Sequence, residues 1–281
     1  MGSSQKVRKE IITFIVIAFA LSSIFYFLLI SAGTLGAKGR WYVLGLMWCP
    51  GIAALITRVL FYRNIRGFGW GWGKTRYQIL SYVLPFSYCL LAYVIVWLSG
   101  LGSINEEFSP NYLLLISLGT ITNCVFALGE EIGWRGFLVP QLAKLTDFTK
   151  TSLITGVIWS IWHYPLVIFA HYNSGTPAWY GLTCFTVMAV GISFALSWIR
   201  LKSGSVWTAM LFHASHNLYI QSFFNPLTKD TGITKFIIGE FGAALAVISV
   251  IVAYIFWRMR SRLTDTQLKS EPEVLAESHG V

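Results

Sequence analysis

Long apolar runs joined by short polar connections extend over most of the chain. A helix needs about 20 mostly apolar residues to cross a bilayer, and eight runs are close to that length. We predict transmembrane helices at residues 11–32, 41–62, 79–101, 112–128, 151–170, 178–199, 205–224 and 236–257. Together they predict a single all-α membrane domain over residues 1–258, and the polar remainder at 259–281 predicts a disordered cytoplasmic tail.

The composition excludes an ordinary soluble protein. Of the 281 residues, 55% are hydrophobic and only 12% are charged, which is about half the charged share of a globular protein. The first apolar run is too long for the core of a signal peptide and lacks a convincing cleavage site, so we expect a retained anchor. The four cysteines lie in apolar runs without a CxxC pair, which argues against disulfides and a thiolate metal site.

The basic residues concentrate on one side of the predicted bundle. The net charge is +9, but the charges lie in short loops between apolar runs, so we expect membrane orientation and no nucleic-acid partner. Eight spans place both termini on one side, which holds 16 Lys and Arg, with Arg135 left uncounted. The other side holds Lys38, Arg40, Lys229 and Lys235. The positive-inside rule therefore predicts an integral membrane protein of the cell membrane with both termini in the cytoplasm.

The segment ALGEEIGWRGFLVPQL places three charges at the end of the fourth span. Central charges cost about 2.5–3.5 kcal/mol each on insertion scales and are retained mainly where they pair or act. Glu131 and Arg135 are four apart on a helix and can form a salt bridge, whereas Glu130 points about 100° away. A carboxyl group beside such a pair suits a general base. The alternative is an interfacial cluster that ends the helix near the cytoplasm.

Polar residues also lie within the fifth and seventh spans. In IWSIWHYPLVIF, His163 is about 18 Å into its span, with Trp159 one turn before it. In AMLFHASHNLYI, His213 and Asn217 share a helix face, and His216 would join His213 if a metal required two imidazoles. Each of these residues could instead serve only the packing of helices against one another.

Together the three segments predict one site in the cytoplasmic half of the membrane. A glutamate that activates water, with His or Asn to stabilise an oxyanion, is a suitable set for hydrolysing a carbonyl compound. The GxSxG motif of serine hydrolases and the HExxH motif of zinc proteases are absent. Glu130, His163 and His213 could hold one Zn²⁺, although ligands on three separate helices are a weak indication of a metal site.

The same segments resemble the motifs of the CAAX prenyl protease and bacteriocin-processing (CPBP, or Abi) family of intramembrane proteases, which includes type II CAAX prenyl endopeptidases. GEEIGWRGFLVP matches its EExxxR motif, HASHN matches HxxxN, and WSIWH matches FxxxH with Trp159 in place of Phe. The motifs lie in the family's order within a core at residues 112–224. We expect the change to Trp159 to affect the shape of the pocket more than its chemistry.

The resemblance implies a bundle of eight transmembrane helices around a conical cavity open to the cytosolic side and to the membrane. It also implies that Glu130 and His163 hold the attacking water, that His213 and Asn217 stabilise the tetrahedral intermediate, and that Glu131 and Arg135 shape and charge-balance the site. Family members have been described both as metalloproteases and as glutamate-dependent proteases. We expect a mechanism that requires no cofactor, with Zn²⁺ on Glu130, His163 and His213 as the alternative.

The expected partners are the lipid bilayer and a peptide or prenylated protein as substrate. Two other functions fit the same polar residues. A transporter or proton pathway would also need buried Glu, Arg and His, although the sequence shows no internal repeat of the kind that many transporters carry. A non-catalytic protein that binds peptides or lipids, of the immunity type, could retain the same cluster.

Overall fold

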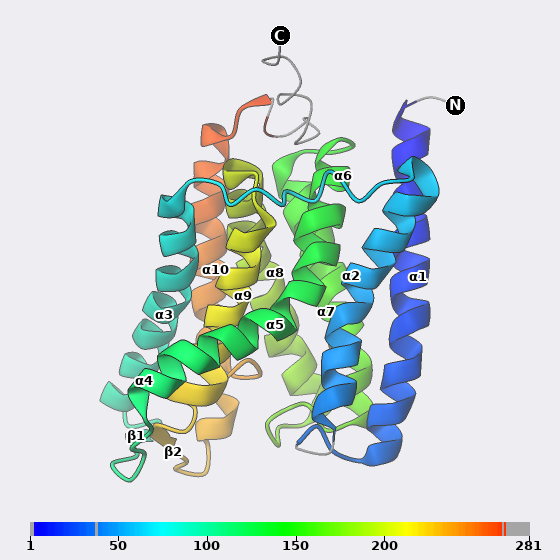
Figure 1. Ribbon diagram of the computed structural model, residues 1–281. Helices are drawn as coiled ribbons and strands as arrows, with labels where there is room; N and C mark the ends of the chain where they lie inside the picture. The colour runs from blue at the N-terminus through cyan, green and yellow to red at the C-terminus, as the bar shows by residue number, and fades with distance from the viewer. Residues whose placement is uncertain (1–2, 37–38, 266, 268–281) are drawn as a thin grey trace.

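The chain folds as a bundle of antiparallel helices (Figure 1). The computed structural model describes residues 3–36, 39–265 and 267. The α-helices are α1 (Ser3–Ala32), α2 (Arg40–Tyr62), α3 (Thr75–Leu98), α4 (Tyr112–Leu114), α5 (Thr120–Glu131), α6 (Val139–Ala143), α7 (Phe148–Phe169), α8 (Ala178–Ser203), α9 (Val206–Asn217) and α10 (Ala243–Arg258).

Shorter elements extend or join these helices. The wider π-helical segments η1 (Leu115–Gly119), η2 (Ile132–Leu138) and η3 (Leu218–Phe224) follow α4, α5 and α9 without a break. The 3₁₀ turns are η4 (Thr234–Phe236) and η5 (Met259–Arg262). The strands β1 (Ser103–Ile104) and β2 (Thr228–Lys229) form a small antiparallel ribbon, in which Ser103 faces Lys229 and Ile104 faces Thr228.

The prediction of an all-α polytopic membrane protein is confirmed. In the described residues, seven helical stretches are long and apolar enough to cross a membrane. The remaining predicted span, at 205–224, corresponds to α9 and η3, a helical stretch that carries His213, His216 and Asn217 in its middle. Side chains such as Phe27, at 70% exposure, lie on the outer faces of the helices, as expected for a surface in contact with lipid.

Two predicted boundaries are wrong. The fourth span does not end at residue 128, because η2 continues the helix and the apolar stretch runs over Tyr112–Ala143. The eighth helix begins at Ala243 rather than at residue 236, because η4 and the bends after it occupy residues 234–242. Of the predicted tail at 259–281, residues 259–262 form η5, and residues 266 and 268–281 lie outside the described residues.

The start of α1 and the end of α10 lie at one end of the bundle, here called the terminal end (Figure 1). The opposite end carries β1 and β2 and is called the ribbon end. The helix directions bring the connections 63–74, 144–147 and 204–205 to the terminal end, with most of the Lys and Arg residues. Arg40, Lys229 and Lys235 lie toward the ribbon end, and Lys38 lies outside the described residues. The structure therefore reproduces the predicted grouping of charges.

Glycines allow α2 to lie directly against α5 and η2. A Cβ atom on Gly129 would be 2.6 Å from the Cα of Trp48, and one on Gly133 would be 2.6 Å from the Cβ of Pro50. These separations are shorter than a carbon–carbon contact allows, so any side chain would push the helices apart. The indole of Trp48 also donates a hydrogen bond to the carbonyl of Val125 at 3.0 Å. This close packing fixes α2 beside the adjacent Glu130.

Candidate active site

Three helical stretches place the predicted site residues in the interior of the bundle. The end of α5 provides Glu130 and Glu131, and η2 provides Arg135. Helix α7 provides Trp159 and His163, while α9 provides His213 and Asn217. One cavity is lined by Glu130, Trp159, His163, His213 and Asn217, whereas Glu131 and Arg135 are buried behind its wall. The structure thus gathers the predicted residues and separates them into a cavity set and a supporting pair.

Glu130 is a buried carboxylate that lines the cavity, with an exposed fraction of 1%. Its Oε2 accepts a hydrogen bond from the indole Nε1 of Trp159 at 2.7 Å. Glu131, the next residue, is directed away to Arg135 and His213. Of the two neighbouring carboxylates, only Glu130 is therefore available to a molecule in the cavity.

Trp159 connects the groups of the site to one another. Its indole donates to Glu130, and its backbone carbonyl lies 2.9 Å from Nδ1 of His163. Its ring also packs edge-on against the ring of His213, with the centroids 5.4 Å apart. The change from Phe to Trp was expected to alter mainly the pocket's shape, but the indole N–H makes a hydrogen bond to the carboxylate that a phenyl ring cannot make. The change therefore also affects the chemistry of the site.

Behind the cavity, Glu131, Arg135 and His213 form a network. Glu131 Oε1 accepts a hydrogen bond from an Arg135 guanidinium nitrogen at 2.8 Å, as the four-residue spacing predicts. The same oxygen lies 2.8 Å from His213 Nδ1. Arg135 also lies over the face of Trp159, 4.2 Å from the ring centroid. Because a carboxylate only accepts hydrogen bonds, Nδ1 of His213 is the donor. Nε2 of His213 then remains available to a molecule in the cavity, which His213 lines.

The ring of His163 is oriented in a similar way. Its Nδ1 donates to the carbonyl of Trp159, since a carbonyl can only accept. Its ring packs against Trp162 and Phe185, with both centroid separations at 4.8 Å. Nε2 of His163 is then free of the proton in the neutral ring and can accept a hydrogen bond from a water molecule.

His216 does not point to a common site with His213 but contacts Tyr88 and Glu240. Its Nδ1 is hydrogen-bonded to the Tyr88 hydroxyl, and its Nε2 is 3.9 Å from an oxygen of Glu240. Within the described part of the chain, no three His, Cys, Asp or Glu side chains form a group that could hold a metal ion. In these residues, Glu130, His163 and His213 are accordingly not grouped as three metal ligands.

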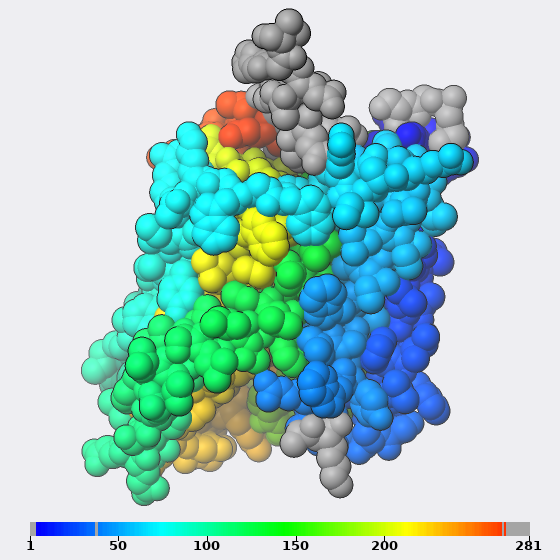
Figure 2. Space-filling model, in the orientation of Figure 1, coloured from blue at the N-terminus to red at the C-terminus, as the bar shows by residue number. Residues whose placement is uncertain are grey.

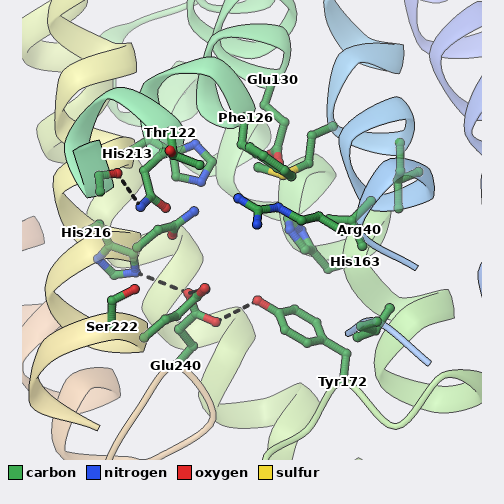
Figure 3. Close-up of a pocket in the computed structure, with 18 of the residues that line it drawn as sticks. Arg40, Thr122, Phe126, Glu130, His163, Tyr172, His213, His216, Ser222 and Glu240 are labelled. Atoms are coloured by element: carbon green, nitrogen blue, oxygen red, sulfur yellow. Dashed lines mark hydrogen bonds and ion pairs between the residues drawn. The ribbon is translucent and has the colours of Figure 1, made fainter. Parts of the chain in front are cut away.

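The cavity has a volume of about 710 Å³. Its upper wall in Figure 3 contains Glu130 and Phe126, and its lower wall contains Tyr172 and Glu240. Apolar side chains of α2, α4, η1 and α5 line most of one side. Figure 2 shows the surface hollowed between α2 and the stretch from α4 to α5, so the cavity is also open toward the surrounding lipid.

The cavity opens at the ribbon end, opposite the chain termini. Its outer lining includes Leu35, Arg40, Pro110, Asn111 and Tyr172, all from helix ends or connections at that end. Among the described residues, the terminal-end connections contribute nothing to the lining. A cavity open to the cytosol and termini in the cytoplasm were both predicted, and this arrangement shows that they exclude each other.

Several cavity residues were not predicted from the sequence. Glu240 accepts hydrogen bonds from Tyr172 at 2.7 Å and from Gln221 at 3.0 Å. Burial raises the pKa of Glu240, which lies in the connection before α10, and these hydrogen bonds act in the opposite direction. Arg40, the first residue of α2, extends its guanidinium into the cavity (Figure 3). The sequence held one indication of Arg40, since it is one of only four Lys and Arg residues predicted on the side opposite the termini.

Comparison with known proteins agrees with the motifs. Residues 110–219 match the family described as "Type II CAAX prenyl endopeptidase Rce1-like". "CAAX prenyl protease 2" of Methanococcus maripaludis is 30% identical over 162 residues, which cover 56% of this chain and 54% of that protein. The chain thus spans about half the length of the curated relative it matches. The matched family segment contains every predicted site residue from Glu130 to Asn217.

Proposed function

We propose that this chain, which belongs to the Rce1-like type II CAAX prenyl endopeptidase family, hydrolyses peptide bonds within the membrane. The observation that carries the proposal is the position of Glu130, a buried carboxylate that shares one cavity with His163, His213 and Asn217. A glutamate with this access to a substrate can act as a general base. The neighbouring Glu131 cannot take this role because it is paired with Arg135 and His213.

In the proposed mechanism, Glu130 and Nε2 of His163 hold a water molecule. Glu130 takes a proton from this water as its oxygen bonds to the carbonyl carbon of the substrate. Protonated His213, through its Nε2–H, and the side-chain amide of Asn217 donate hydrogen bonds to the oxyanion, and Glu131 balances the positive charge on His213. The C–N bond then breaks, and Glu130 passes its proton to the leaving nitrogen. The products are a carboxylic acid, which ionises in water, and an amine, and Glu130 is again a carboxylate.

The structure supports a role for Glu131 and Arg135 in positioning rather than in bond breaking. Neither residue lines the cavity, and both have an exposed fraction of 0%. Glu131 orients His213 through Nδ1, in the way that a buried carboxylate orients the histidine of a serine protease. Arg135 keeps the Glu131 carboxylate paired in a region of low dielectric.

The proposed substrate is a membrane-associated peptide or a prenylated protein. The relative's printed name supports a prenylated protein, and the cavity offers an apolar wall open toward lipid, where an isoprenoid or a peptide side chain would be accommodated. Cleavage requires no resident cofactor in this proposal. Elemental analysis of the purified protein tests that part of the proposal. A metal ion bound at stoichiometric level would mean that the metal, rather than Glu130 alone, activates the water.

Mass spectrometry of membrane peptides provides the test of proteolysis. The purified protein in lipid nanodiscs is incubated with membrane peptides and with a farnesylated CAAX reporter, and new peptide termini are recorded. We expect new termini with the wild-type protein and none with Glu130→Ala. Glu106→Ala, which changes an exposed glutamate outside the cavity, is the matched control and should cleave normally. Cleavage by a folded Glu130→Ala protein would contradict the proposal.

We also propose that the terminal end faces the cytoplasm, on the basis of its excess of basic residues. The cavity then opens on the non-cytoplasmic side, and peptides of that side or of the outer leaflet become its substrates. Of the two proposed substrates, this orientation favours the membrane-associated peptide, whereas the opposite orientation would favour the prenylated protein.

Labelling of single cysteines in intact cells tests the orientation. In a background without the native cysteines, a membrane-impermeant maleimide should label Lys229→Cys at the ribbon end. It should label Lys74→Cys at the terminal end only after the cells are permeabilised. The reverse pattern would place the cavity on the cytoplasmic side and favour cytosolic substrates.

A further inference from the structure

Glu240 is a second buried carboxylate of the cavity, on the wall opposite Glu130 (Figure 3). It lies in the connection before α10, with an exposed fraction of 7%. The hydroxyl of Tyr172 donates to its Oε2 at 2.7 Å, and the side-chain amide of Gln221 donates to its Oε1 at 3.0 Å. Hydrogen bonds of this kind favour the charged form of a carboxyl group. The proposed mechanism of hydrolysis leaves this group unused.

Glu240 lacks a permanent counter-ion in the described part of the chain. No Lys or Arg there forms an ion pair with it. Arg40, the arginine of the cavity lining, has its guanidinium 5.7 Å from the ring centroid of Phe126 instead. Nε2 of His216 is 3.9 Å from Oε1 of Glu240, which is beyond hydrogen-bond distance. Burial of a carboxylate without a counter-ion is costly, so a cation that enters the cavity would be bound there.

The side chains around Glu240 offer oxygen atoms to such a cation. Tyr172 and Gln221 direct an O–H and an N–H to Glu240, so the Tyr172 hydroxyl oxygen and the Gln221 amide oxygen remain as acceptors. All three residues line the cavity and are here called the Glu240 site. A lysine ammonium carries three N–H donors and no acceptor, which suits a carboxylate, a hydroxyl and an amide oxygen. An anion would be repelled by Glu240.

The Glu240 site lies one helical turn from a proposed catalytic residue. Gln221 follows Asn217 by four residues in the continuous helical stretch of α9 and η3, and both line the cavity. Four residues of helix correspond to about 6 Å. An extended peptide covers at most about 3.3–3.6 Å per residue, so a peptide with its scissile bond at Asn217 would place a residue one or two positions away beside Gln221.

Aromatic rings hold the other side of the site against the catalytic groups. The ring of Phe185 packs against that of His163 at 4.8 Å between centroids and stacks on that of Phe241 at 5.4 Å. Phe241, the residue after Glu240, packs edge-on against Tyr172 at 4.9 Å. Two rings thus connect His163 to Tyr172, so the position of the Glu240 site relative to the reacting groups is fixed by packing.

We propose that the Glu240 site binds the ammonium group of a lysine side chain in a peptide that occupies the cavity. This inference rests on the proposed function and adds a determinant of specificity, because a lysine one or two residues from the cleaved bond is then preferred. The head group of phosphatidylethanolamine carries the same ammonium chemistry, and the cavity is open toward lipid. The distance of one helical turn from Asn217 favours the peptide, and the lipid is tested as a competitor.

The test measures binding, so it does not depend on hydrolysis. Acetyl-leucyl-lysyl-leucine amide, and the same peptide with norleucine in place of lysine, are titrated into the purified full chain in phosphatidylcholine nanodiscs. We expect the lysine peptide to bind roughly 10- to 100-fold more tightly, as for hydrogen bonds to a charged group. Glu240→Gln should remove this preference, and Tyr172→Phe should retain part of it because the carboxylate stays. Glu106→Gln, which removes an exposed charge outside the cavity, should keep the full preference.

The outcomes separate this inference from the proposed function. Equal binding of the two peptides to the wild type, or no binding of the lysine peptide at millimolar concentration, overturns the site even if the protein is a protease and needs no variant to fold. A full preference in a folded Glu240→Gln protein overturns it as well. Loss of the preference when phosphatidylethanolamine replaces phosphatidylcholine would assign the site to lipid and contradict the inference. A preference for lysine in a protein without proteolysis would support the site and contradict only the proposed function.

Discussion

Replacing Glu130 with glutamine is expected to lower kcat for peptide hydrolysis by about 10²- to 10⁴-fold, the range that a general base usually contributes. The amide oxygen of glutamine can accept the same hydrogen bond from Trp159 Nε1, but the amide cannot take a proton from water. Because the shape and this hydrogen bond are retained, the thermal unfolding midpoint should not fall. Hydrolysis rates and unfolding curves of the same preparation provide the measurement.

Two further variants define what this result means. Trp159→Phe keeps a ring but removes the donor to Glu130, so it should lower kcat less than Glu130→Gln does. Glu106→Gln replaces an exposed glutamate and should leave both readings unchanged. If Glu130→Gln folds and hydrolyses at the wild-type rate, another group activates the water and the proposed mechanism is wrong.

Local periodicity accounts for the features that the sequence predicted correctly. Four-residue spacing placed Arg135 beside Glu131, and the two groups are 2.8 Å apart. The rotation of one residue on a helix placed Glu130 on another face, and Glu130 alone of the two carboxylates lines the cavity. Both relations hold within a single helical stretch, so they need no knowledge of how the helices pack.

Contacts between residues of different helices could not be predicted from the periodicity along a single helix. The contact of His213 with Glu131 and that of Trp159 with Glu130 join residues far apart in the chain. Glu240 and Arg40 belong to no motif, and they enter the cavity only because of where α2 ends and where the chain turns before α10. The end at which the cavity opens also depends on such a relation, namely on how the helical stretch from α4 to α5 lies relative to α2.

Replacing Glu131 with glutamine is expected to lower the free energy of unfolding by about 3–5 kcal/mol, as when one partner of a buried ion pair is removed. Arg135 would then remain buried without its carboxylate, and His213 would lose the charged acceptor of Nδ1. Hydrolysis should also fall, because the orientation of His213 depends on that acceptor. This variant thus loses stability and activity together, in contrast to Glu130→Gln. Denaturant or thermal unfolding in detergent, with hydrolysis rates measured well below the midpoint, provides the comparison.

Two matched variants separate pairing from positioning. Glu107→Gln breaks the exposed pair with Lys229, which should change the free energy of unfolding by no more than about 1 kcal/mol. The double variant Glu131→Gln/Arg135→Met removes both buried charges, so much of the stability should return, because no unpaired cation remains. Its hydrolysis rate should stay low, since His213 still lacks a carboxylate. If the double variant regained full activity with its stability, Glu131 would have only a structural role. Wild-type stability in Glu131→Gln would show that the buried pair does not stabilise the fold.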